Sequence, residues 1–150
     1  MKRSQHLLFV ALLLVPMLAA GLGLVRAAAP PTRYTTTAGV VLDNCTGLHW
    51  QQGHDAGQGW TNAAAYCQNN TAGLSGTNWR LPTIKELQSI VDETVLNPSI
   101  DTATFTAVPD CYWSSSKVAG NSGLAWAVFF SSGGTTSFGL ANPCRVRCVR

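Results

Sequence analysis

Charged residues are scarce in this sequence, where Asp, Glu, Lys and Arg together make up 11% of the 150 residues. The formal net charge of +3 comes from the N-terminus, because Lys2, Arg3 and Arg26 are three of the ten basic residues. Ten minus three leaves seven basic residues, which balance the seven acidic ones in the rest of the chain. A neutral chain has no net attraction for polyanions, so neither nucleic acid nor a membrane surface is expected as a partner.

Residue patterns typical of metal sites and of catalysis are also missing. There are three His and no C-x-x-C pair, so no zinc site is expected. Asp92 and Glu93 are neighbours on an expected helix and face different directions, which leaves no pair of carboxylates for acid-base chemistry. Cys45 and His49 are the best remaining candidates for a nucleophile and its base, but a tight hairpin separates them. We therefore predict that the protein is not an enzyme and needs no cofactor.

The first 29 residues have the pattern of a secretory signal peptide. Lys2 and Arg3 precede an apolar run over residues 7–25, and Ala residues follow at positions 27–29. We expect residues 1–29 to be removed on export to the periplasm, the cell surface or the extracellular space. An uncleaved signal anchor is the alternative, because the apolar run is long enough to cross a bilayer. About 120 residues remain, which is enough for one domain.

All five Cys lie in the exported part, where oxidation is permitted, so disulfide bonds are expected. An odd count leaves at least one thiol unpaired. The simplest count is two bridges and one free thiol. Cys67 on the first helix and Cys148 on the last strand are both expected to face inward, so we favour a bridge between them, a second between Cys111 and Cys144, and a free Cys45. The residues alone permit other pairings.

Turn residues and hydrophobic periodicity predict strands first, then two helices, then more strands. Residues 30–38 are rich in Pro and Thr and are interpreted as a leader. The stretch "VVLDNCTGLHWQ" predicts a hairpin, because Asp, Asn and Gly form a turn between two apolar runs. After the helices, "YWSS", "AWAVFF", "TTSFGL" and "RVRCVR" predict strands, and "AWAVFF" is apolar on both faces. Helices followed by a run of strands indicate an α+β fold.

Each expected helix has a start signal. In "GWTNAAAYCQNN", Thr61 is the expected N-cap. In "NWRLPTIKEL", Thr83 and Glu86 form a capping box, so Glu86 is assigned to the helix end rather than to catalysis. Arg80 in the same stretch is expected to pair with a carboxylate such as that of Asp92, or with backbone carbonyls.

The region between Cys111 and Cys144 is the expected ligand-binding part, because Ser, Gly, Asn and aromatic residues supply hydrogen bonds and stacking area. Arg145 and Arg147 alternate on one face of the last strand and are suited to bidentate contacts with sulfate or carboxylate groups. Two alternatives stay open: Trp113 packs in the core, and the two Arg form a solvated strand edge. The candidate ligand-binding residues are Lys117, Asn121, Arg145, Arg147 and Trp113.

The ordered set "TGLHW", "GW…AAAYC", "NWRLPTIKEL", "YWSS", "AWAVFF…GG" and "RCVR" resembles one bacterial family over residues 39–150. This is the C-terminal domain family named after the Legionella collagen-like adhesin, formerly a domain of unknown function. The resemblance implies a C-type-lectin-like fold, with two helices packed on a small antiparallel sheet and a long loop region. It also implies a bridge from a helix to the last strand and a second one near the loop region. Both support the pairs Cys67–Cys148 and Cys111–Cys144.

The family suggests recognition of glycans or proteins at cell surfaces. We therefore predict an exported, non-catalytic module for glycan recognition or adhesion. The alternative is a structural or assembly module that binds a protein partner in the bacterial envelope. Some relatives form trimers, so a homo-oligomer stays open, although this chain has no collagen-like repeat to drive one. Calcium-dependent lectins need a Trp-Asn-Asp string, which the sequence lacks, so no calcium site is expected.

Overall fold

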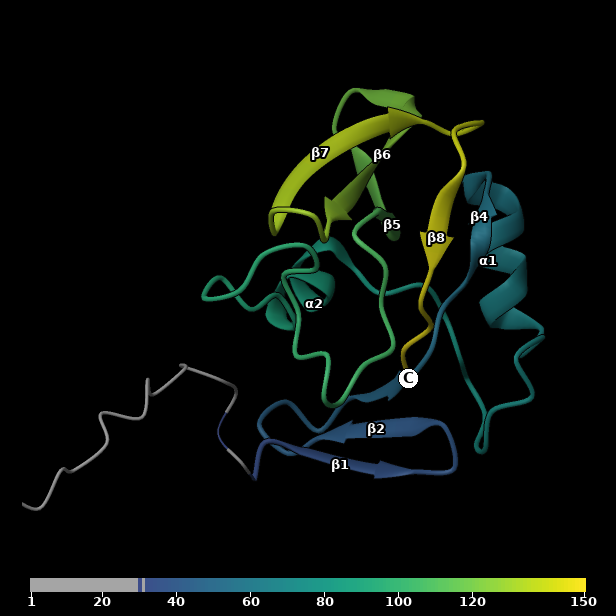
Figure 1. Ribbon diagram of the computed structural model, residues 1–150. Helices are drawn as coiled ribbons and strands as arrows, with labels where there is room; N and C mark the ends of the chain where they lie inside the picture. Colours follow the sequence, from purple (N-terminus) through teal and green to yellow (C-terminus); the bar gives the residue numbers. More distant parts are fainter. Residues whose placement is uncertain (1–29, 31) are drawn as a thin grey trace, which may run out of the picture.

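The structure, a computed structural model, describes residue 30 and residues 32–150, so the expected signal peptide lies outside the described residues. Two sheets and two helices make up this part of the chain (Figure 1). The three-stranded sheet has the order β1(Tyr34–Thr37), β2(Val40–Asp43), β3(His49–Gln51). The five-stranded sheet has the order β4(Asp55–Gln58), β8(Cys144–Val146), β5(Cys111–Val118), β6(Asn121–Phe129), β7(Gly134–Gly139). The helices are α1(Trp60–Gln68) and α2(Ile84–Ser89).

The predicted α+β class and its two helices are confirmed. The expectation of one small antiparallel sheet is wrong, because the strands form two sheets and β5 pairs with β8 in parallel at Tyr112 and Arg145. The hairpin predicted around Asp43 is formed by β2 and β3, which pair antiparallel. The order of the strands within each sheet depends on contacts between segments far apart in the sequence, and local periodicity does not indicate these contacts.

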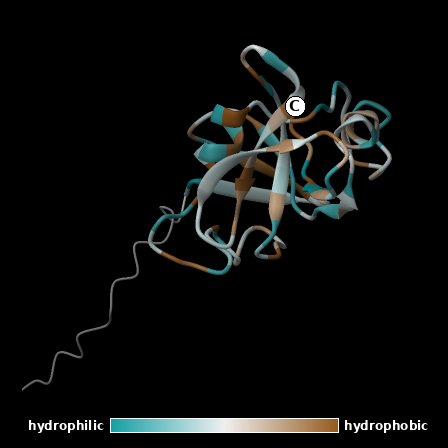
Figure 2. Cartoon of the chain, turned by 90° about the horizontal axis from the view of Figure 1, so that it is seen from above, coloured by the Kyte–Doolittle hydropathy of each residue, from teal (hydrophilic) through white to brown (hydrophobic). Residues whose placement is uncertain are grey.

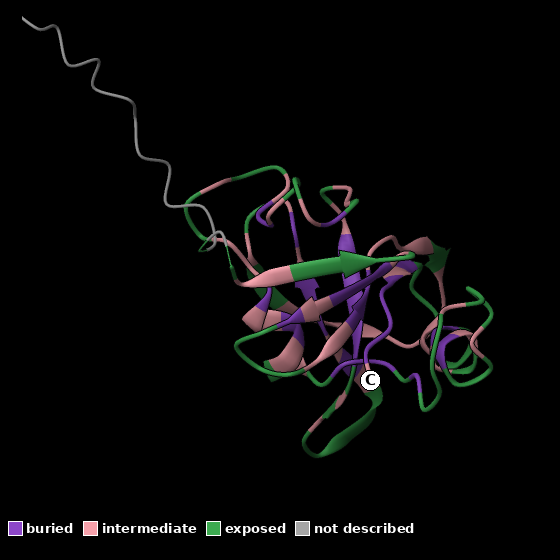
Figure 3. Cartoon of the chain, turned by 90° about the horizontal axis from the view of Figure 1, so that it is seen from below, coloured by how far each residue is buried: buried purple, intermediate pink, exposed green. Residues whose placement is uncertain are grey.

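The leader predicted at residues 30–38 contains a strand, which corrects that prediction. β1 pairs antiparallel with β2 and lies exposed along the edge of the small sheet (Figure 3). An ion pair anchors its start, because Arg33 donates to the buried carboxylate of Asp43 at 3.0 Å and to the Ser89 carbonyl at 2.6 Å. Burial alone would raise the pKa of Asp43, but hydrogen bonds from the Arg33 guanidinium and the Cys45 backbone N–H hold it below its ordinary value. The contacts of Arg33 thus tie the start of β1 to the end of α2.

The core lies on both faces of β6, an interior strand between β5 and β7, as the doubly apolar "AWAVFF" predicted. Ala125 and Ala127 pack in a cluster that includes α1, whereas Val128 and Phe130 pack in a second cluster that includes α2. In Figure 2 the apolar segments of the strands gather in the middle of the molecule. A sheet covered on both faces needs apolar residues at consecutive positions, which is what this strand has.

Two disulfides close the domain, and they join the pairs that the sequence favoured. Cys67 in α1 is bonded to Cys148 beyond β8, at a sequence separation of 81. Cys111 at the start of β5 is bonded to Cys144 at the start of β8. Cys45 is a free, exposed thiol in the turn between β2 and β3.

The start of α1 differs from the prediction, because the N-cap is Gly59 and Thr61 lies inside the helix. The cause is close packing: a Cβ at Gly59 would lie 3.1 Å from the Leu140 carbonyl oxygen. The same carbonyl accepts the backbone N–H of Trp60 at 2.8 Å. A contact from the chain before β8 therefore sets where the helix begins.

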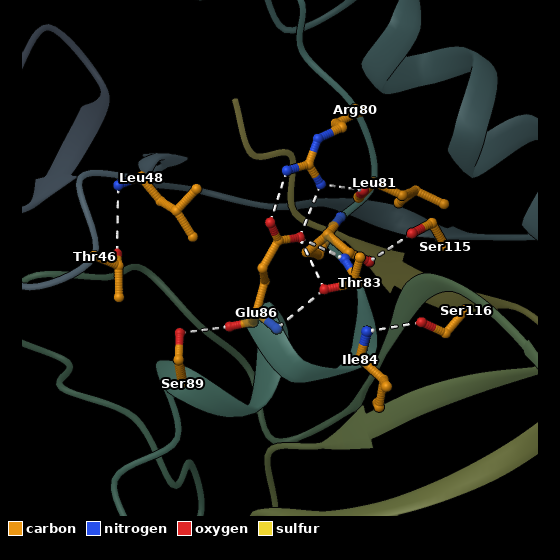
Figure 4. A network of polar contacts seen from close by, with 11 residues as sticks. Thr46, Leu48, Arg80, Leu81, Thr83, Ile84, Glu86, Ser89, Ser115 and Ser116 are labelled. Atoms are coloured by element: carbon orange, nitrogen blue, oxygen red, sulfur yellow. Dashed lines mark hydrogen bonds and ion pairs between the residues drawn. The ribbon is translucent and has the colours of Figure 1, made fainter.

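The start of α2 is the predicted capping box between Thr83 and Glu86 (Figure 4). Arg80 donates to a carboxylate and to a backbone carbonyl, that of Leu81 at 3.2 Å, as expected, but the carboxylate is that of Glu86 and not of Asp92. Its two terminal nitrogens donate to the two Glu86 carboxylate oxygens at 2.8 and 2.7 Å. The Arg80 guanidinium and the hydrogen bonds from Thr83 lower the pKa of Glu86 from 4.5 to about 2. One carboxylate thus joins the loop before α2 to the first turn of that helix.

This pKa shift predicts a specific acid sensitivity. The pKa of Glu86 is lower in the folded protein than its ordinary value of 4.5. The ionised carboxylate therefore stabilises the fold fully above about pH 4.5, and this stabilisation is lost as the pH falls toward 2. Between about pH 5 and pH 2, we expect wild type to lose about 1 kcal/mol more unfolding free energy than Glu86→Gln, because water screens this partly exposed pair. Urea unfolding at several pH values measures the difference. Parallel pH profiles for the two proteins would contradict the assignment.

Candidate ligand-binding site

Two of the residues predicted to bind a ligand lie in the interior, so the prediction is wrong for both. Trp113 is 0% exposed, and its indole N–H donates to the Gln58 carbonyl at 2.8 Å. Arg147 is also 0% exposed. A period of two assigns residues to the two sides of a strand but does not reveal that both sides are covered. Here β3 and the segment before β5 cover the side expected to face water, where they meet Arg147.

Arg147 is a buried cation held by backbone carbonyls. It donates to the carbonyls of Gln51 at 3.1 Å, Gln52 at 2.8 Å and Thr106 at 2.8 Å. Its guanidinium carbon lies 4.7 Å from the ring centroid of Phe105. Burial lowers the pKa of Arg147 to about 10, so the group is still charged at neutral pH. The guanidinium thus ties the last segment to β3 and to the chain before β5.

The other three predicted residues are not buried, but each already has a partner in the protein. Arg145 donates to the Asp110 carboxylate at 3.1 Å. The Lys117 ammonium donates to the Ser122 carbonyl at 3.3 Å and lies 3.8 Å from the ring centroid of Trp60. Asn121 accepts a hydrogen bond from the backbone of its own turn. Other residues line the surface cavities near β1 and in the 92–103 loop. The five predicted residues therefore do not form one site.

A cavity of about 260 Å³ opens on one face of the three-stranded sheet. The strand register places Thr35 opposite Leu42 and Leu42 opposite His49, so these side chains share that face. The cavity has apolar groups from β2 and hydroxyl groups from β1 and from the loop after α1. Its lining residues are Thr35, Thr37, Val40, Leu42, His49, Ser75 and Arg150.

Arg150 is the charged residue of this cavity. Its backbone N–H and C=O both pair with His49, each at 3.0 Å, which holds it beside β3. The guanidinium carbon lies 5.5 Å from the ring centroid of Trp79. Among the described residues, no carboxylate or carbonyl accepts a hydrogen bond from this side chain, and its Nε is buried without a partner. Arg150 therefore has donors that the described part of the protein does not satisfy.

Gly76 leaves the space that this side chain occupies. A Cβ at position 76 would lie 2.7 Å from the Arg150 guanidinium carbon, too close for any real contact. The backbone at Gly76 also has φ of +90°, which disfavours other residues. Glycine at this position therefore fits both the turn and the placement of Arg150.

The sequence offered a signal for Arg150 that the prediction did not use. The alternation that puts Cys148 on the inner side of the last segment puts position 150 on that side too. The structure agrees, since Cys148 and Trp79 belong to one core cluster and Arg150 lies over Trp79. Which groups surround Arg150 depends on β1–β3 and the loop at Ser75, and no local pattern connects these segments.

A second cavity, of about 360 Å³, lies in the loop between α2 and β5. Two of its lining residues are acidic, but Asp92 accepts the Thr94 N–H at 2.9 Å and Asp101 accepts the Thr104 hydroxyl at 2.7 Å. Leu96 at its rim is 71% exposed.

Among residues 30 and 32–150, no three or more His, Cys, Asp or Glu converge as a metal site. Within the same residues, no helix is long and apolar enough to span a membrane.

Fold and cavity together define a small α+β domain, bridged by two disulfides, with a cavity of mixed polar and apolar lining on its smaller sheet. Residues 39–150 match the Lcl C-terminal domain family, and the chain belongs to this family. No curated protein matches the sequence.

Proposed function

We propose that this protein is an exported domain that recognises a glycan, has no catalytic activity, and binds its ligand in the cavity of the three-stranded sheet. The observation that carries the proposal is the unsatisfied Arg150 side chain beside the hydroxyls of Thr35, Thr37 and Ser75. Sugars present hydroxyl groups around an apolar ring face. In the cavity, Val40 and Leu42 contribute apolar groups, and polar side chains that can form hydrogen bonds lie beside them. Two disulfides support export, because such bonds persist in oxidising compartments.

A glycan array probed with the exported, disulfide-bonded protein tests this function. We expect retention of a limited set of saccharides, release by the free sugar, and weaker retention of Thr37→Val, which replaces one cavity hydroxyl by a methyl group. The matched control is Thr61→Val, which makes the same change at an exposed Thr on α1 that does not line the cavity. An array that retains nothing, or equal retention of the two variants, would argue against glycan binding in this cavity.

A protein partner in the envelope is the second candidate. It is favoured by Leu96, the one large apolar side chain that stays mostly exposed in the described residues, at the rim of the 92–103 cavity. Co-purification of one fixed envelope protein that depends on Leu96, together with an empty glycan array, would select this function instead.

A further inference from the structure

We infer that the ligand presents a single carboxylate to Arg150, as a uronic acid residue of a glycan does. This inference rests on the proposed function and names the chemistry of the same cavity. A planar guanidinium pairs with a planar carboxylate through two parallel hydrogen bonds, and such charge-assisted bonds are the strong ones in proteins. The lining of the cavity contains no acidic residue that would compete for Arg150.

The other cations of the described chain explain why one carboxylate is expected rather than a polyanion. Arg33, Arg80 and Arg145 each form an ion pair with a carboxylate. Arg147 is buried among carbonyls, and Lys117 donates to the Ser122 carbonyl at 3.3 Å. Lys85, exposed on α2, is the remaining cation besides Arg150. Seven basic and seven acidic residues also cancel over this part of the chain. A polymer with many sulfates gains affinity from many free cations, which this surface does not offer.

The surroundings of Arg150 fit a sugar acid better than a bare anion. Leu42 pairs across the sheet with both Thr35 and His49, so an apolar group lies between two polar ones on the cavity face. A pyranose ring has the same combination of apolar face and polar edge. His49 and the hydroxyl groups can therefore bond the ring oxygens while Arg150 holds the carboxylate.

Gly76 acts in this site as a positioning residue. A methyl group at position 76 would displace the Arg150 guanidinium, because the two would be only 2.7 Å apart. Gly76→Ala is thus expected to weaken binding while leaving the charge of the cavity unchanged. Its effect should be larger on the acidic ligand than on a neutral one, which a general loss of structure would not produce.

Calorimetric titration of the exported protein with trigalacturonic acid and with its methyl ester tests the inference. We expect the ester to bind about tenfold more weakly or worse, because it loses the charge-assisted pair. Arg150→Gln should weaken the acid by a similar factor and abolish the difference between acid and ester. Arg150→Lys, which keeps the charge but loses the planar fork, should fall between the two. Lys85→Gln removes an exposed cation on α2 and should change nothing.

The outcomes separate this inference from the function on which it rests. If the acid and the ester bind equally well, glycan binding is supported and the inferred contact between Arg150 and a ligand carboxylate is wrong. If neither saccharide binds but a short peptide binds more tightly than its C-terminal amide, Arg150 recognises a peptide carboxylate and both proposals are overturned. If heparin binds with a steep salt dependence that Arg150→Gln leaves unchanged, the ligand is a polyanion held elsewhere. Thermal unfolding of each variant identifies any loss of binding that comes from loss of fold.

Discussion

Replacement of both Cys67 and Cys148 by Ala is expected to lower the free energy of unfolding by about 4 to 5 kcal/mol on the chain-entropy account of disulfides. The bridge has a sequence separation of 81, so its removal frees most of the domain in the unfolded state. Both sulfur atoms are also in the core, where Cys67 is 0% and Cys148 is 1% exposed. A loss of this size is a large part of the stability of a domain this small.

Urea unfolding of the double variant measures this loss, and two other variants calibrate it. Removal of the Cys111–Cys144 bridge, with a sequence separation of 33, should cost about 4 kcal/mol or slightly less on the same account. Cys45→Ala should leave stability within about 0.5 kcal/mol of wild type, because the residue is exposed and unpaired. A Cys67/Cys148 variant as stable as Cys45→Ala would refute the role given to the long bridge.

Substitution of the buried cation should have the second large effect. Arg147→Met keeps much of the side-chain volume but removes the donor to the carbonyls of Gln51 and Thr106. The Gln52 carbonyl loses Arg147 as well but still accepts the backbone N–H of Thr106 at 3.1 Å. Because buried acceptors without partners cost about 1 to 3 kcal/mol each, we expect a loss of about 3 to 5 kcal/mol after partial relaxation. Thermal and urea unfolding measure it. A variant that loses glycan binding but keeps its stability would instead indicate that Arg147 contacts the ligand.

Arg145 provides a matched control two residues away. Its guanidinium is partly exposed and pairs with Asp110, whose carboxylate is also partly exposed. Surface ion pairs contribute about 0 to 1 kcal/mol, so Arg145→Met should be destabilised by less than about 1 kcal/mol. Equal losses for the two variants would mean that the burial of Arg147 does not determine its importance.

Several local features could be read from the sequence because each depends on a few neighbouring residues. Thr83 and Glu86 form the capping box that their spacing predicted. Val128 and Ala127 pack on opposite faces of β6, since a strand alternates whatever its surroundings are. The turn between β2 and β3 follows from the conformations that Asp, Asn and Gly prefer.

Other features failed because they depend on segments far apart in sequence. β1 was interpreted as a leader, since its Thr-rich composition does not show that Arg33 reaches Asp43 and the end of α2. Arg147 was placed on the surface, since alternation does not show what covers each side of a strand. Tertiary contacts decided both outcomes.

Three properties of this protein could be predicted from its residues alone: an α+β domain with two helices, cysteines suited to disulfides, and membership of the family over residues 39–150. These follow from composition, spacing and local periodicity, which act over a few residues. Which arginine side chain has no hydrogen-bond acceptor depends on tertiary contacts, because these determine which distant groups come within hydrogen-bonding distance. In the folded protein Arg147 is buried and Arg145 is paired with Asp110, whereas Arg150 lies beside β3 with a buried Nε that no described residue accepts.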